Sequence, residues 1–354
     1  GPQCSAEQWI KLAEQSGIPM PAVGREAIKN GLLNLHRLFS QAPTLGSLIN
    51  PAELPADLIA ADFETIQPYL TAILKAEKAD DETRERAIAA AGMVKAADLL
   101  AGEYTLVITN VPYLGRGKQD STLQSWGDTQ APDAKRDLAT MFVSRSMKWL
   151  TTGGSVGVVT PQNWLFLTTY KVLRDRLLRQ AQWDWLVRMG EHAFENSAAA
   201  GAFAAMVCIS KTSPPDAHLM LGIDVSAPRG QRPIYAGEKA VLLKGESTES
   251  KQVADLRQLP QAGQRKNPDA RILLEPHSDL KRLVEFAESV KGITTGDPDR
   301  FIRRFWEVVR RPPGWEWFQS TVQSHIAFGG CESIVEWHGG NGPMNEVPGA
   351  RTYG

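Results

Sequence analysis

A chain of 354 residues, with 42% hydrophobic and 22% charged residues, has the size and composition of a globular protein of one large or two ordinary domains. Its net charge of −1 at pH 7 excludes a uniformly basic surface, although a local basic cleft for nucleic acid remains compatible with it. Cys4, Cys208 and Cys331 lie far apart, so we expect no metal site and a reducing, cytoplasmic compartment. The longest apolar run, Ala198 to Ile209, is too short to cross a bilayer, and we expect no membrane contact.

The two ends of the sequence lack features that are expected of a complete gene product. The chain starts without an initiator Met or a signal peptide, and its last residues, 349–354, stop in a polar segment. We therefore interpret it as an internal fragment of a longer protein.

Residues 1–100 are expected to be mostly helical. The stretches 22–39 and 81–100 carry apolar residues at spacings of three and four, and prolines interrupt the pattern between them. We interpret this segment as helical packing within or preceding a catalytic half.

The pattern changes at Tyr104, where short β-branched runs begin to alternate with amphipathic stretches. Residues 114–135 are expected to form a polar loop. The alternation predicts a doubly wound α/β fold with a mainly parallel sheet, in which ligands bind beyond the carboxyl ends of the strands. The predicted strands are 104–109, 155–160, 183–189 and 204–210, and the predicted helices are 137–150, 168–180 and 278–289.

Asn110 follows the first predicted strand directly and opens the tetrapeptide Asn110-Val111-Pro112-Tyr113. An exocyclic amino group such as that of adenine is a poor nucleophile, because its lone pair is delocalised into the ring. Two acceptors that take both N–H hydrogens turn the lone pair toward a methyl donor. The Asn110 side chain and the Val111 carbonyl can be these acceptors, Pro112 can stiffen the turn, and Tyr113 can stack on a base taken out of the duplex. Taken alone, the tetrapeptide favours an ordinary turn that ends a strand, and it is the strand–helix context that reverses this preference and favours a site.

The run from Thr109 to Gln119 resembles the fourth motif of the gamma-type amino-methylating DNA methyltransferases, which usually carry Asn-Pro-Pro-Tyr. The Val111 variant followed by Leu-Gly-Arg-Gly-Lys is similar to the PglX-type adenine-specific methylases of BREX phage-defence systems and to large restriction-modification methylases. Residues 153–166 and 292–297 match further, so the resemblance covers about residues 95–330. It implies a Rossmann-like S-adenosylmethionine-dependent methyltransferase fold that methylates adenine in double-stranded DNA. Other proteins of a defence system are further candidate partners.

The resemblance also implies site residues outside the tetrapeptide. Phe194 corresponds best to a phenylalanine that stacks on the flipped base, although a core phenylalanine at a strand end is an equal reading. Asp98 is the candidate contact to the adenine of S-adenosylmethionine, although its residue type alone favours a solvated or helix-terminal aspartate. Asn110 is expected to lie next to this cofactor.

One feature of the family is missing from residues 1–100. A glycine-rich donor loop of the Asp-Pro-x-x-Gly-x-Gly type and an acidic residue after it should precede the motif, and neither is present. We therefore expect the base-binding half of the domain at 101–215, without most of the donor-binding half.

The composition shifts again at Gly292, where arginine and aromatic residues become dense. After a linker or helical region at 216–290, we expect residues 291–354 to begin a target-recognition domain, with Arg300, Arg303 and Arg304 as DNA contacts. A structural strand–turn region with a solvated arginine face is the alternative.

Two other functions remain open at this point. Methylation of a protein glutamine poses the same chemical problem at an amide nitrogen, but a small protein-modifying enzyme would not need the C-terminal arginine and aromatic segment. A DNA-binding or assembly module of a defence complex that has lost its chemistry is the other alternative.

Overall fold

The computed structural model describes residues 5–14, 18–21, 24–54, 61, 64–69, 92–93, 95–195, 202–227, 230–249, 253–275, 285–287, 292–320 and 329–352. The chain divides into two compact units, 1–276 and 277–354, which are described one by one. The helix predicted at 278–289 lies largely outside the described residues. Among those residues, no helix has the length and apolar character needed to cross a membrane.

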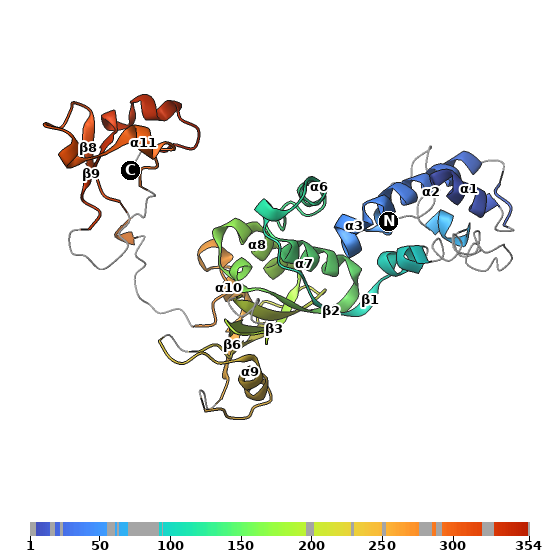
Figure 1. The fold of residues 1–354 in the computed structure, drawn as a ribbon. Coiled ribbons are helices and arrows are strands. Elements are labelled where there is room, and N and C mark those ends of the chain that lie inside the picture. The colour runs from blue at the N-terminus through green and yellow to red at the C-terminus, as the bar shows by residue number, and fades with distance from the viewer. Residues whose placement is uncertain are drawn as a thin grey trace. The chain divides into compact units, whose positions relative to one another are not determined.

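The described N-terminal residues of the first unit are mostly helical, as predicted, whereas most of the predicted stretch 81–100 lies outside the described residues. This N-terminal part contains α1 (Ala6–Glu14), α2 (Arg25–Ser40) and α3 (Ala42–Leu45), and helical turns recur at 64–69 and 95–101 (Figure 1). Helix α2 buries Leu32, Leu35 and Phe39, which recur at spacings of three and four and therefore share one face.

The first unit is built on a six-stranded sheet with the order β1-β2-β4-β3-β5-β6. The pairs β1–β2 and β3–β5 are parallel, whereas β2–β4, β3–β4 and β5–β6 are antiparallel. The strands are β1 (Tyr104–Asn110), β2 (Leu150–Pro161), β3 (Gln182–Gly190), β4 (Ala204–Ser210), β5 (Leu219–Asp224) and β6 (Asp255–Pro260).

The α/β class is thus confirmed, but the expectation of a mainly parallel sheet is wrong. Helical connections lead from β1 to β2 and from β2 to β3, which gives these three strands the same direction. Strand β4 then inserts between β2 and β3 and runs opposite to both. A buried apolar run such as 204–210 looks the same in either direction, so the sequence pattern carried no information on this point.

Helices α7 (Leu138–Trp149) and α8 (Lys171–Gln180) confirm the two predicted crossovers, and Figure 1 shows them on the same side of the sheet. The polar loop expected at 114–135 is wrong in its middle, where α6 (Ser121–Gln130) forms. The Asp120 carboxylate accepts a hydrogen bond from the Leu123 amide at 2.8 Å and so caps the helix, whose anchor Leu123 is buried. With one capping residue and few apolar residues, α6 lacks the clear helical spacing of hydrophobic residues by which a helix is recognised in a sequence.

Residues expected to form a linker or helical region also join the first unit. Strands β5 and β6 extend the sheet, and they flank the short helix α9 (Ala236–Leu243). After β6, the turn α10 (Gln261–Gln264) follows.

Strand β1 lies at the edge of the sheet and pairs with β2 alone among the described strands. One of its faces packs toward the core through Val107, whereas Leu106 and Ile108 on the other face are 57% and 77% exposed. Large apolar side chains on an edge strand are a surface that proteins usually cover.

The second unit contains a three-stranded antiparallel sheet with the order β7-β9-β8. Its small core contains the buried residues Phe301, Val335 and Met344. The elements are α11 (Pro298–Phe301), β7 (Ile302–Arg304), β8 (Trp315–Phe318) and β9 (Ser333–Glu336).

Candidate functional site

The carboxyl ends of β1, β2, β3 and β5 lie at one edge of the sheet, because these four strands run in the same direction. Asn110, Pro161 and Gly190 are the last residues of β1, β2 and β3. Ligands of α/β sheets bind at this edge. The structure therefore brings the motif after β1 and the loop after β3 to the same side of the molecule.

Asn110 and Val111 offer two acceptors at the end of β1. The Asn110 side chain is exposed, and no hydrogen bond from the described part of the chain engages it. The Val111 side chain is only 4% exposed and belongs to the core, which fixes the backbone at that residue. Its carbonyl oxygen accepts no hydrogen bond from any residue that the structure describes, so both acceptors are available to a ligand.

Tyr113 and Phe194, the two aromatic residues predicted to hold a base, contact each other. Their ring centroids are 6.4 Å apart with an interplanar angle of 63°, an edge-to-face arrangement. Both rings are half-buried. The Tyr113 hydroxyl is buried without a partner among the described residues, and this burial, with a smaller effect of Asp137, raises the pKa of Tyr113 to about 12.

The segment after Tyr113 is fastened to the start of α7. Asp137 caps α7 by accepting from the Ala139 amide at 2.9 Å, and it also accepts from the Leu114 amide at 3.4 Å. The Leu138 amide donates to the Leu114 carbonyl at 3.0 Å. Asp137 is 8% exposed, and its burial raises the pKa of its carboxyl group. The N-terminus of α7 thus fixes the backbone that follows Tyr113.

The loop that carries Phe194 is fastened by a residue that sequence reasoning missed. Lys239 of α9 is 1% exposed, and its Nζ donates to the carbonyl oxygens of Met189 and Glu191. No sequence signal marked it, because a lysine in a short amphipathic stretch is normally solvated.

Gln162 and Phe203 were also missed, although they lie at the same edge. The Gln162 amide nitrogen of the backbone donates to the Phe203 carbonyl at 2.7 Å, and the Gln162 side-chain oxygen is buried without a partner among the described residues. Both residues line a cavity of about 550 Å³ that also includes Arg188 and His192. The position of Gln162 directly after Pro161 was a usable signal, whereas Phe203 had none.

Asp98, the predicted donor contact, lies in the helical turn before β1. Its exposed carboxylate accepts a hydrogen bond from Gln67 Nε2 at 2.7 Å. The described glycines before β1 stand singly and form no glycine-rich turn: Gly24, Gly31, Gly46, Gly92 and Gly102. The described residues before β1 therefore do not contain the glycine-rich turn through which the backbone of such folds approaches a nucleoside cofactor. The donor role of Asp98 stays a prediction.

Arg300, Arg303 and Arg304, the predicted DNA contacts, are exposed on the second unit. The Arg303 guanidinium donates to two backbone carbonyls at the junction of α11 and β7. Arg304 lies 3.9 Å from a carboxylate oxygen of Glu332. These contacts leave the DNA role of the three arginines a prediction.

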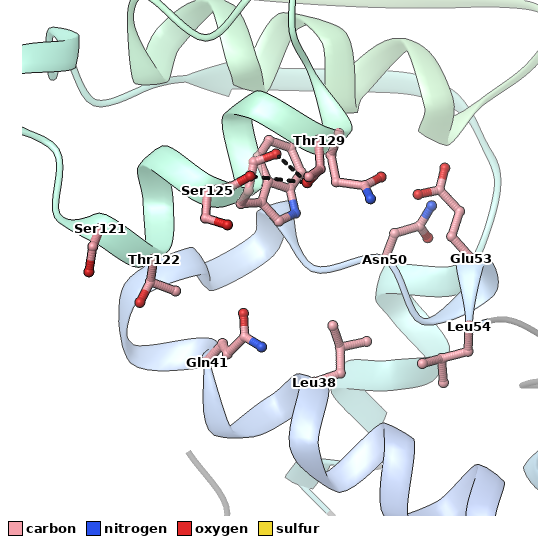
Figure 2. A pocket seen from close by; sticks show the side chains of 11 residues that line it. Leu38, Gln41, Asn50, Glu53, Leu54, Ser121, Thr122, Ser125 and Thr129 are labelled. Carbon is pink, nitrogen blue, oxygen red and sulfur yellow. Dashed lines mark hydrogen bonds between the residues drawn. The ribbon is translucent and has the colours of Figure 1, made fainter.

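A further cavity of about 700 Å³ lies away from all predicted site residues, between α6 and the segment that follows α2. Figure 2 shows Ser121, Ser125 and Thr129 of α6 facing Gln41 and Asn50 across it. Its carboxylate, Glu53, pairs with Lys148 at 2.7 Å. Hydroxyl and amide groups dominate this cavity.

Comparison with known proteins finds methylases that are similar to part of this chain. Residues 34–194 match the family model of the Eco57I restriction-modification methylase. The chain is 30% identical over 164 residues to the adenine-specific methyltransferase BrxX of Escherichia coli O9:H4 (strain HS), which covers 46% of this chain and 13% of the relative. It is 30% identical over 105 residues to the adenine-specific methyltransferase PglX of Lacticaseibacillus casei (strain Zhang), with 29% and 8% covered. The chain therefore spans only a small part of the length of these relatives.

Among solved structures, a modification subunit of a putative type I restriction enzyme from Vibrio vulnificus YJ016 is similar with a TM-score of 0.33 and 14% identity, covering 68% of this chain and 62% of that one. The M protein of the type I restriction enzyme EcoKI is similar with a TM-score of 0.28 and 14% identity, covering 69% and 52%.

The matched region, residues 34–194, includes both Asn110 and Phe194. The resemblance to the PglX-type methylases that we read from the motif is confirmed over this part of the chain.

Proposed function

We propose that this chain provides the target-base half of an adenine-specific DNA methyltransferase. The whole enzyme transfers a methyl group from S-adenosylmethionine to the exocyclic amino group of an adenine flipped out of double-stranded DNA. The observation that carries the proposal is the set of two acceptors, Asn110 and Val111, that have no partner among the described residues and lie next to the aromatic pair of Tyr113 and Phe194.

The acceptors act on the two N–H hydrogens of the amino group. When the Asn110 side-chain oxygen and the Val111 carbonyl accept both hydrogens, the nitrogen becomes pyramidal, and its lone pair is no longer delocalised into the ring and becomes available for attack. The same two oxygens stabilise the positive charge that develops on this nitrogen, and the carbonyl of Val111, a residue fixed in the core, needs no reorganisation.

The aromatic residues act on the ring of the base. A flipped base loses its stacking in the duplex, and the rings of Tyr113 and Phe194 can replace that contact. S-adenosylmethionine supplies the methyl group when it is bound. Asp98 and Asn110 are our candidates for its contacts, and Arg300, Arg303 and Arg304 for contacts to DNA outside the target base.

Methyl transfer itself tests the proposal. In a longer chain that joins this segment to a donor-binding half, Asn110→Ala should lower the transfer of tritiated methyl groups to DNA by a factor on the order of a hundred or more. Near wild-type transfer would contradict the assignment. Methylation of a glutamine-containing protein in place of DNA would favour the alternative substrate, and wild-type binding of DNA without any transfer would favour a non-catalytic module.

A further inference from the structure

The loop that follows β3 contains a residue, His192, whose backbone conformation its side chain does not favour. Gly190 has a φ of +66° and His192 a φ of +56°, both in the left-handed region. A side chain at Gly190 would approach the Ser226 Cβ to 2.9 Å. A non-glycine residue such as His192 keeps a positive φ only where its surroundings impose it. The loop therefore needs an external restraint.

Lys239 provides a restraint on one side of the loop. Its Nζ donates to the Met189 carbonyl at 2.6 Å and to the Glu191 carbonyl, and these two groups flank Gly190. No carboxylate of the described residues lies within ion-pair distance of this ammonium group. A buried ammonium group has to be satisfied by hydrogen bonds, so the loop and the lysine depend on each other.

Tyr235 provides a second restraint from the start of the same helix. Its ring lies 5.0 Å from the His192 ring, at an interplanar angle of 48°. Tyr235 is the N-terminal capping residue of α9, and the Glu238 side chain accepts from its backbone amide at 3.3 Å. Helix α9 therefore contacts the loop at two points, through Lys239 and through Tyr235.

Phe194 follows His192 by two residues and reaches the ring of Tyr113. We propose that Lys239 is a positioning residue for the target base: it holds the loop after β3 in the conformation that places Phe194 against Tyr113. The inference rests on the proposed function for its consequence in base binding, but the contact between the two rings can be tested without DNA. It adds α9, a helix beyond the matched family region, to the base-binding site.

A fluorine label on Tyr113 measures the contact directly. The chain is prepared with 3-fluorotyrosine, and the Tyr113 resonance in the ¹⁹F spectrum is assigned with Tyr113→Phe. Phe194→Ala defines the resonance of Tyr113 without its partner. Lys239→Met should move the resonance most of the way to that position. The matched control is Lys244→Met, because Lys244 is the exposed capping residue at the C-terminus of α9, and this variant should leave the resonance unchanged.

A resonance that stays at the wild-type position in folded Lys239→Met, while Phe194→Ala moves it, would overturn the inference. If Lys239→Met fails to fold, Tyr235→Leu removes only the ring contact to His192. This variant should shift the resonance in the same direction by a smaller amount, and an unchanged resonance would count against the restraint by α9.

Base binding separates this inference from the proposed function. The probe is a duplex with a mismatched adenine and a fluorescent label at one end, and its binding is measured by fluorescence anisotropy. Lys239→Met should weaken binding of this probe by a factor on the order of five to a hundred, the equivalent of one stacking contact, and leave binding of a fully paired duplex unchanged. If Asn110→Ala weakens probe binding and Lys239→Met does not, the positioning role is wrong. If neither variant affects probe binding although the Tyr113 resonance moves, the proposed function is wrong and the restraint stands.

Discussion

The ring of Tyr113 lies 6.4 Å from the ring of Phe194, although the two residues follow different strands that are separated in the sheet by β2 and β4. This contact exists because β1 and β3 end at the same edge of the sheet, and because hydrogen bonds hold the loop after each of these strands. Asp137 holds the first loop through Leu114, and Lys239 holds the second through the carbonyls beside Gly190.

Tyr113→Ala should affect a flipped base far more than paired DNA. Stacking on an aromatic ring stabilises a base by roughly 1–3 kcal/mol, whereas contacts to phosphate do not involve this side chain. We expect weaker binding of a duplex with a mismatched target base and unchanged binding of a fully paired duplex at the same salt concentration. Equal losses on both substrates would indicate that Tyr113 has only a structural role.

Asp137→Ala should loosen the motif turn as well as α7. Loss of the cap should lower the free energy of unfolding by about 1 kcal/mol, as measured by chemical denaturation. Asp120→Ala is the matched control, since Asp120 caps α6 in the same way but makes no contact with Leu114. Both variants should lose stability, but only Asp137→Ala should shift the ¹⁹F resonance of a fluorinated Tyr113. A shift of equal size in both would show that Asp137 does not act on the turn.

Lys239 should give the stability of the chain a distinctive dependence on pH. Burial lowers the pKa of its ammonium group from 10.5 to about 8, although Asp224 and Glu191 act in the opposite direction. Between these two values the unfolded chain binds more protons than the folded chain. The contribution of Lys239 to the free energy of unfolding therefore rises with pH across this window, by at most about 1.4 kcal/mol per pH unit.

Denaturation of the wild type and of Lys239→Met across this pH window measures that contribution, because other titrating groups cancel in the difference. The wild type should gain stability relative to the variant as the pH rises. Lys244→Met serves as the control and should show a constant difference. A wild type that loses stability relative to Lys239→Met in this range would contradict the assigned environment.

The chain as it stands should bind S-adenosylmethionine weakly or not at all. Binding of the cofactor needs a glycine turn that lets the backbone approach it and a carboxylate for its ribose, and residues 1–100 contain no such loop. The exposed Leu106 and Ile108 on the edge strand should also make the chain poorly soluble when it is expressed alone. Calorimetric titration with the cofactor is the test. A dissociation constant in the low micromolar range would mean that a donor site exists in this chain and that we have misplaced it.

The strands and crossover helices could be predicted from the sequence because each has a strong local signal. The run 204–210 is apolar and largely buried, and Asp137 precedes an amphipathic stretch. The direction of β4 and the place of β5 and β6 in the sheet could not be predicted, because pairing partners are set by tertiary packing and leave no trace in the periodicity. Helix α6 escaped notice for the related reason that packing, not its weak period, stabilises it.

In the candidate site, too, some residues could be predicted from the sequence and others could not. Asn110 to Tyr113 form a contiguous motif with a chemical rationale, so sequence analysis could propose them together. Lys239 acts through two backbone carbonyls distant in sequence, and no residue pattern encodes such a contact. The same holds for Arg174, which is fully buried and donates to backbone carbonyls of Trp164, Leu167 and other residues.

The central claim is that Asn110 accepts a hydrogen bond from the amino group of the target adenine. Its most direct test compares the affinity of the chain for two mismatched duplexes that differ at one position, adenine in one and purine, which lacks the amino group, in the other. The wild type should bind the adenine duplex more tightly by a factor on the order of five, the equivalent of about 1 kcal/mol for one hydrogen bond. Asn110→Ala should remove most of this preference while it leaves the affinity for the purine duplex unchanged. An Asn110→Ala variant that still prefers adenine as strongly as the wild type would contradict the claim.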